Sequence, residues 1–116
     1  MNRIPFTHLN WESAEKTEHP GSKGTSTWFT LYAGDLRIRK VHYSAGYVSG
    51  HWCSKGHVVH CLDGEFVSEQ QGNNTIHFSE GMSYVVSDNE PPHKSSSVNG
   101  ATLLIIDGDF LKTEKQ

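Results

Sequence analysis

The sequence predicts a single all-β domain, built as a sandwich or barrel of short antiparallel strands. Three observations lead to this prediction. The chain has 116 residues, the size of one domain with one core. Its apolar residues occur in short, often alternating runs and not at helical spacing. Eleven glycines punctuate these runs, as turns do in β proteins.

The first 24 residues are polar and poorly periodic, and a Pro-Gly pair interrupts them. We expect residues 1–24 to form an N-terminal arm that packs on the barrel or on a partner subunit, with a short helical turn near residues 12–16. The domain itself is expected over residues 25–110. Residues 111–116 are expected to form a polar C-terminal tail.

The rest of the chain is expected to form nine short strands, because runs of alternating or β-branched residues are separated by Gly-centred turns. In order they cover residues 25–32, 36–43, 48–53, 57–62, 65–69, 75–78, 82–86, 93–98 and 101–106. Asp63-Gly64 is typical of a two-residue hairpin turn. The apolar run at 101–106 is typical of a central strand buried on both faces.

Charge and composition exclude several classes of partner. The formal net charge is −3 and no basic stripe is present, which argues against a nucleic-acid partner. No apolar run approaches the roughly 20 residues of a membrane span, and the first residues lack the apolar segment of a signal peptide. We therefore expect a cytoplasmic protein with no membrane partner, in which Cys53 and Cys61 are free thiols.

Three metal-binding side chains fall within seven residues, at His51, Cys53 and His57. In an extended strand, residues two apart share a face, so His51 and Cys53 are expected to point the same way. The turn at residues 54–56 can then fold the chain back and place His57 beside them. This spacing indicates a metal centre.

The same stretch resembles a known family. The pattern Gly46-x4-His51-x-Cys53-x3-His57-x6-Gly64 is similar to the first motif of the cupins, in which His-x-His, a glutamate and a final glycine stand at these positions. Ser79-Glu80-Gly81 resembles the Pro-x-Gly turn of the second motif, and His93, behind two prolines, resembles the histidine that completes the site. The resemblance covers about residues 36–106.

More narrowly, the chain is similar to the small single-domain cupins named for a DHCW motif, although Gly50 stands where the aspartate of that motif is expected. The cupin resemblance implies a jelly-roll barrel of two antiparallel sheets with a metal near one mouth. It also implies a homodimer.

Carried over from the family, the metal ligands are His51, Cys53, His57 and His93. Cys53 takes the place of the second histidine and His57 that of the glutamate. A thiolate with imidazoles favours Zn or Fe, with Ni or Cu as further candidates, over Mg, Ca or Mn. The alternative is that Cys53 is a small buried hydrophobe and the histidines are surface or core residues.

Further pocket residues are expected from strand parity. Arg39 and Tyr43 share one face of their strand, and if that face looks inward they bind an anionic or hydroxylated small molecule. The alternative is an arginine ladder exposed on an outer sheet. Tyr84 and Trp28 either line the mouth or belong to the core or a dimer interface.

These features lead to two main functional hypotheses. The first is a metal-dependent enzyme, dioxygenase- or isomerase-like, acting on a small organic molecule. The second is a non-catalytic cupin that binds or senses a small molecule or the metal itself. A metal-free structural cupin is a third alternative. The cupin fold hosts many reactions, so the sequence leaves open whether the protein is an enzyme.

Overall fold

The structure is a computed structural model that describes residues 3–72 and 74–112. Within these residues the chain forms short antiparallel strands and two 3₁₀ helices, and no helix is long and apolar enough to cross a membrane. The elements are η1 (Trp11–Ser13), β1 (Glu15–Pro20), β2 (Thr25–Ala33), β3 (Leu36–Tyr43), β4 (Tyr47–Val48), β5 (His57–Gln70), β6 (Asn74–Ser79), β7 (Ser83–Val86), β8 (His93–Ser97), β9 (Ala101–Asp107) and η2 (Asp109–Leu111).

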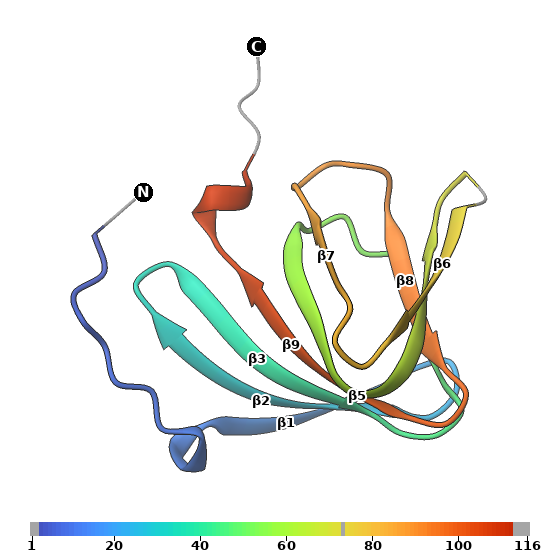
Figure 1. Ribbon diagram of the computed structural model, residues 1–116, viewed down its shortest axis with the longest axis horizontal. Coiled ribbons are helices and arrows are strands. Elements are labelled where there is room, and N and C mark those ends of the chain that lie inside the picture. The colour runs from blue at the N-terminus through green and yellow to red at the C-terminus, as the bar shows by residue number, and fades with distance from the viewer. Residues whose placement is uncertain (1–2, 73, 113–116) are drawn as a thin grey trace.

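The strands form one curled antiparallel sheet in the order β1-β2-β3-β9-β5-β8-β4, and β6 and β7 also pair with β5. Strands β1, β2, β3 and β9 curve along one side, and β6, β7 and β8 close over the other (Figure 1). The all-β jelly-roll prediction is confirmed. The interior lies between these two sides.

The long strand β5 joins the two sides of the barrel. Its first part pairs with β7 and β9, and its second part pairs with β6 and β8. The prediction of a hairpin at Asp63-Gly64 is wrong, because the chain continues through a bulge between Cys61 and Asp63. Gly64 has φ +77°, and a Cβ there would lie 2.4 Å from the Gly100 carbonyl oxygen. Its backbone therefore bends the strand and does not reverse it.

The segment expected as an N-terminal arm contains a strand. Glu15–Pro20 pairs with β2 as the edge of the sheet, and the helical turn occupies Trp11–Ser13. Every residue of β1 is exposed or half-buried. It therefore lacks the apolar alternation by which a strand is predicted from sequence. The paired β1 belongs to the sheet.

Strand β9 lies at the centre of the sheet but is fully buried on only one face. Its residues alternate between buried and half-buried, so the prediction of burial on both faces is wrong. Inward residues of β3, β4, β5, β6 and β9 build the apolar core, namely Val41, Tyr43, Tyr47, Val59, Cys61, Phe66, Phe78, Ala101, Leu103 and Ile105. Phe66 and Phe78 stack with their ring centres 5.0 Å apart.

Two further segments differ from expectation. The strand expected over residues 48–53 ends at Val48, and Cys53 is held only by an isolated bridge to His93. At the other end, Leu111 belongs to η2 and is buried, so the expected tail does not begin there. Residues 113–116 of that tail lie outside the described residues.

Candidate metal centre

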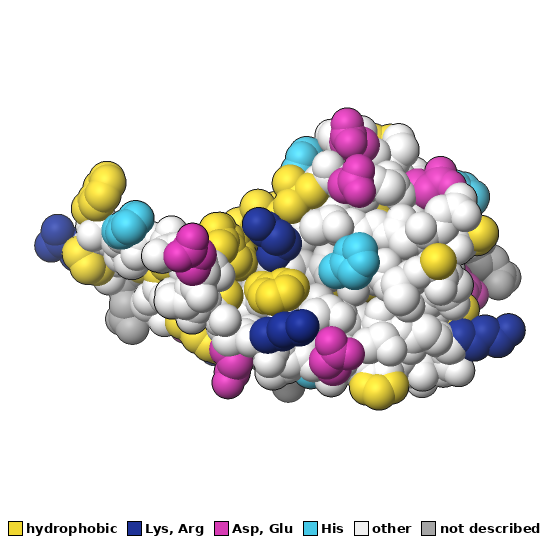
Figure 2. Space-filling model, turned by 90° about the horizontal axis from the view of Figure 1, so that it is seen from below, with side chains coloured by type: hydrophobic (Ala, Val, Ile, Leu, Met, Phe, Trp, Pro, Cys, Tyr) yellow, Lys and Arg dark blue, Asp and Glu magenta, His cyan; other side chains and the backbone are white. Residues whose placement is uncertain are grey.

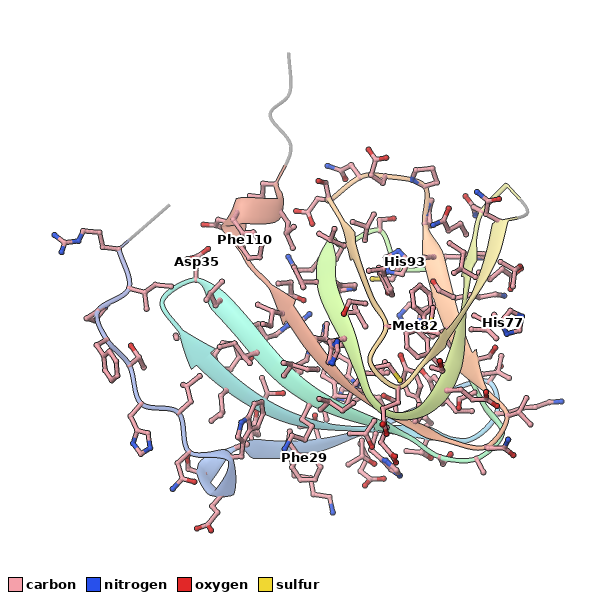
Figure 3. The ribbon with its side chains drawn as sticks, in the orientation of Figure 1. Phe29, Asp35, His77, Met82, His93 and Phe110 are labelled. Carbon is pink, nitrogen blue, oxygen red and sulfur yellow. The ribbon has the colours of Figure 1, made fainter. Side chains whose placement is uncertain are left out.

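Three of the four predicted ligands meet in the structure. Cys53, His57 and His93 each offer one ligand atom, and these atoms all lie within 4.8 Å of one another. Cys53 comes from the loop before β5, whereas His57 and His93 are the first residues of β5 and β8. The ring of His93 points between the strands toward the barrel interior, whereas His77 points away from it (Figure 3).

Local backbone structure explains why these side chains converge. Cys53 and His93 exchange two backbone hydrogen bonds, with N···O distances of 2.8 and 3.0 Å. The turn that follows Cys53 needs glycine at position 56, because a Cβ there would lie 2.6 Å from the Val86 carbonyl oxygen. The N–H of Gly56 donates to the Asp88 carboxylate at 2.5 Å. This fixed turn brings His57 Nε2 to 3.6 Å from Cys53 Sγ.

A carboxylate that the sequence analysis missed orients His57. His57 Nδ1 lies 3.2 Å from Asp107 Oδ2, and Asp107 is only 1% exposed. When Nδ1 donates to this carboxylate, neutral His57 directs the lone pair of Nε2 into the site, and protonated His57 donates from Nε2 to the Cys53 thiolate. A metal-binding histidine is commonly held by a carboxylate in this way. The sequence contained a signal for Asp107. In a strand, alternate residues share a face, so Asp107 shares the inward face of Leu103 and Ile105, one residue beyond the expected end of the strand.

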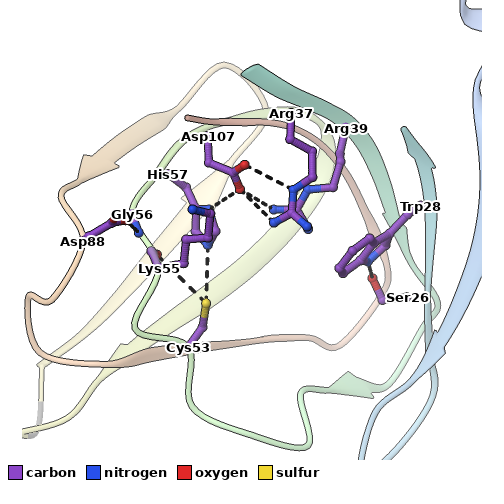
Figure 4. Close-up of polar contacts among 10 residues, drawn as sticks. All are labelled: Ser26, Trp28, Arg37, Arg39, Cys53, Lys55, Gly56, His57, Asp88 and Asp107. Carbon is purple, nitrogen blue, oxygen red and sulfur yellow. Dashed lines mark hydrogen bonds and ion pairs between the residues drawn. The ribbon is translucent and has the colours of Figure 1, made fainter. Parts of the chain in front are cut away.

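The same carboxylate binds two arginines. Arg37 donates through Nε and Nη2 to both oxygens of Asp107, at 3.1 and 2.9 Å, and Arg39 donates through Nη2 at 3.1 Å (Figure 4). Arg39 is 4% exposed and its guanidinium carbon lies 4.3 Å from the ring centre of Trp28. The face of β3 that carries Arg39 therefore looks inward, and the exposed-ladder alternative is wrong.

This environment shifts the pKa values of the site. Hydrogen bonding by His57, and then by His93, lowers the pKa of Cys53 to about 5, although partial burial opposes the change. Burial lowers the pKa of His57, but its bonds to Asp107 and Cys53 outweigh burial and raise it overall. Burial likewise opposes ionisation of Asp107, yet His57 and the two arginines hold its pKa well below the usual range. The site is therefore built for a thiolate.

The structure does not bring His51 into the group of ligand atoms. His51 is exposed on the loop after β4, where the parity argument fails because no strand is formed. It nevertheless lines the same cavity. Tyr43 and Tyr84 line this cavity too, and burial raises the pKa of each, that of Tyr43 to about 12. Both phenols are therefore neutral at physiological pH.

The residues present fit a transition metal. His93 Nε2 is buried and has no hydrogen-bond partner among the described residues. A thiolate and two imidazoles, one of them backed by a carboxylate, match the ligands of Zn²⁺ and related ions. In a tetrahedral site the ligand atoms are about 3.4–3.8 Å apart. The 3.6 Å between Cys53 Sγ and His57 Nε2 already lies within this range.

The site opens into a cavity of about 240 Å³ at the mouth of the barrel. Besides the three ligands, its wall includes Arg37, Arg39 and Trp28, and every described strand except β6 contributes residues to it. A cavity of this kind, with convergent polar groups and shifted pKa values, is where a small molecule binds in most proteins.

No family model and no curated protein matches this chain. Solved structures do match. An RmlC-like cupin from Shewanella frigidimarina is 20% identical over 89% of this chain and 90% of that chain, with a TM-score of 0.65. Ectoine synthase from P. lautus is 16% identical over 93% and 80%, with a TM-score of 0.68. FeII HppE is 11% identical over 87% and 59%, with a TM-score of 0.72.

These likenesses establish the architecture. The chain has the cupin fold, as the resemblance of its motifs predicted. At such low identities the comparisons show the fold alone, and function has to be argued from the site.

Proposed function

We propose that this protein binds a divalent transition metal through Cys53, His57 and His93 and receives a small organic molecule in the adjoining cavity. One observation carries the proposal: three ligand atoms from separate segments converge within 4.8 Å, and Asp107 orients one of them. The likeness to FeII HppE, whose name includes iron, supports it at the level of the fold.

Zn and Fe are the metals that this ligand set fits best, with Ni and Cu as further candidates. With three protein ligands, a coordination position stays open for substrate or water. The metal would supply Lewis-acid chemistry as Zn and oxygen or redox chemistry as Fe. A dioxygenase- or isomerase-like activity on a small molecule is therefore the proposed class, with non-catalytic binding or sensing as the alternative.

Elemental analysis of protein purified without added metal tests this proposal. We expect near-stoichiometric metal in the wild type and a large loss in His93→Ala and Cys53→Ser. His77→Ala is the matched control, because His77 lies on β6 away from the site and should retain metal. His51→Ala is expected to retain metal as well, and a loss there would add His51 to the ligand set. Equal retention in all variants would overturn the proposal.

A second candidate is suggested by the chain of contacts from Cys53 through His57 to Asp107. A thiol, a histidine and an orienting carboxylate in this order form the arrangement of a nucleophile with its base. The Sγ–Nε2 distance of 3.6 Å is long for a hydrogen bond but is within the range of looser apo geometry. Iodoacetamide labelling decides between the two. Protection of Cys53 by bound metal favours the metal site, whereas rapid labelling of protein as purified favours the nucleophile.

We also propose a cytoplasmic homodimer related to the DHCW cupins. A row of apolar side chains crosses the outer face of the sheet in register, at Leu31, Ile38, Ile106, Val58 and Val85. Seen from below, hydrophobic side chains gather beside basic ones (Figure 2). The row supports self-association. Sedimentation should give a dimer that Val85→Lys weakens and Val98→Lys, also at an exposed site, does not.

A further inference from the structure

The cavity beside the candidate metal centre has an unusual charge. Four of the chain's ten lysines and arginines line it, and none of the thirteen aspartates and glutamates is among its lining residues. The basic residues are Arg37, Arg39, Lys55 and Lys94. This excess of positive charge stands within a chain whose formal net charge is −3.

The buried anions do not neutralise this excess. Asp107, behind the wall, supplies one negative charge to two guanidinium groups. Even if Cys53 is counted as a thiolate, two anions face four cations. Half of the chain's eight histidines also line the cavity, and each can add charge or a donor but no negative charge. The wall is therefore complementary to an anion.

Arg39 in particular keeps unused donors. It is 4% exposed and donates to Asp107 only through Nη2. Its buried Nε has no hydrogen-bond partner among the described residues. A buried donor without a partner is costly, and an incoming acceptor offsets that cost. Arg37, by contrast, uses Nε and Nη2 for Asp107, and its other amino group makes no hydrogen bond to the part of the chain that the structure describes.

The walls next to these donors are apolar. Trp28, Val41, Ile105 and Tyr84 line the same cavity. The ring of Trp28 is already stacked on Arg39 and on His19, with ring centres of the latter pair 3.7 Å apart, so its orientation is fixed. A ligand with one anionic end and one apolar body would meet both kinds of surface.

From this arrangement we propose that the cavity takes a small carboxylate with an apolar body, whose carboxylate pairs with Arg39 and Arg37. The planar fork of a guanidinium matches a carboxylate in shape as well as in charge. The proposal deepens the proposed function by naming the class of molecule that enters the cavity. It does not depend on the metal, because the two arginines are not ligands.

Calorimetric titration of metal-free protein with benzoate tests the proposal, with neutral benzamide as the matched probe. We expect benzoate to bind at least about tenfold more tightly than benzamide, since hydrogen bonds to a charged acceptor are stronger than those to a neutral one. Arg39→Gln and Arg37→Gln should each weaken benzoate about tenfold. Lys40→Gln is the control, because Lys40 adjoins Arg39 on β3 but lies on the outer face over Trp11. It should change binding less than about twofold.

Three outcomes would overturn the proposal: no benzoate binding, equal binding of benzoate and benzamide, or unchanged binding in both arginine variants. Tighter binding of inorganic phosphate than of benzoate would also overturn it and would reassign the cavity to phosphate. Each arginine variant removes a partner of buried Asp107, so the melting temperature of each should be measured beside binding. Arg37, whose side chain is 29% exposed against 5% for Arg39, provides the variant that perturbs the fold less. Metal content, measured on the same variants, reports failure of the metal proposal separately.

Discussion

The two cysteines of this chain lie eight residues apart, one in a polar environment and the other in an apolar one. Cys53 stands half-exposed at the mouth of the barrel beside two histidines, which lower its pKa to about 5. Cys61 is 0% exposed among apolar side chains, and burial raises its pKa. The difference extends to their surroundings. At the mouth, ionic groups are buried in pairs, whereas the other end of the interior is closed by apolar packing.

The interior of the barrel has an apolar part and an ionic part, and the two have different roles. Phe66, Leu103 and Val59 are each at most 2% exposed and hold the sheets together by burial alone. Asp107 is as buried as they are, but it is satisfied by three cationic or hydrogen-bonding partners. Buried ionic groups contribute little net stability and are costly to unpair. We therefore expect stability to depend on the apolar end and ligand binding on the mouth.

The largest expected effect on stability is at the apolar end. Phe66→Ala should lower the free energy of unfolding by about 3–5 kcal/mol, because it leaves a cavity under Phe78 and Tyr84. Urea denaturation measures the change. Val98→Ala is the control, since Val98 is 78% exposed and its loss should cost less than about 0.5 kcal/mol. A comparable loss in both would contradict the assignment of the core.

The next effect is at the mouth. Asp107→Asn should weaken metal binding by about 10–100-fold, because the amide no longer fixes the Nδ1 proton of His57. Competition with a chromophoric chelator measures the affinity. Asp88→Asn is the matched control, since that carboxylate binds the Gly56 N–H and not a ligand side chain. Equal affinity in Asp107→Asn and the wild type would show that the carboxylate does not act through His57.

A third prediction separates the two thiols directly. In metal-free Cys61→Ala protein, the ultraviolet absorbance of the thiolate should appear with a midpoint near pH 5, because the histidines stabilise the Cys53 anion. In Cys53→Ser protein, Cys61 should stay protonated beyond the usual thiol pKa, since burial disfavours its anion. Equal titration midpoints for the two thiols would contradict the difference in environment between Cys53 and Cys61.

The smallest effect concerns pH and stability. Because the folded pKa of Cys53 lies below that of the unfolded chain, its contribution is fully present above the unfolded thiol pKa of about 8.5 and is lost as pH falls through about 5. The raised pKa of His57 acts in the opposite sense, present at low pH and lost as pH rises through that pKa. Unfolding of Cys53→Ser should therefore depend less on pH between 5 and 8.5 than that of the wild type.

Local patterns predicted most of this fold because strand alternation is a property of neighbouring residues. The alternation of β3 and the glycines around it predicted the bounds that the structure shows, Leu36–Tyr43. Strand β1 escaped prediction because its residues are polar, and pairing with β2 creates it. Asp63-Gly64 was wrongly predicted to be a hairpin turn: Gly64 has a positive φ, but pairing with the neighbouring strand β9 makes the segment a bulge and not a turn.

The sequence by itself determined the residue types of the site, since His51, Cys53 and His57 fall within seven residues and a distant His93 follows two prolines. Only the tertiary structure decided which of them meet. His51 lies beside Cys53 in the chain yet remains outside the group, because the loop after β4 is not extended as a strand. Asp107, fifty residues from His57, enters it because β9 packs against β5. The types of side chain decide which metal the site can bind, whereas the meeting of these side chains depends on pairing between strands that are distant in the sequence.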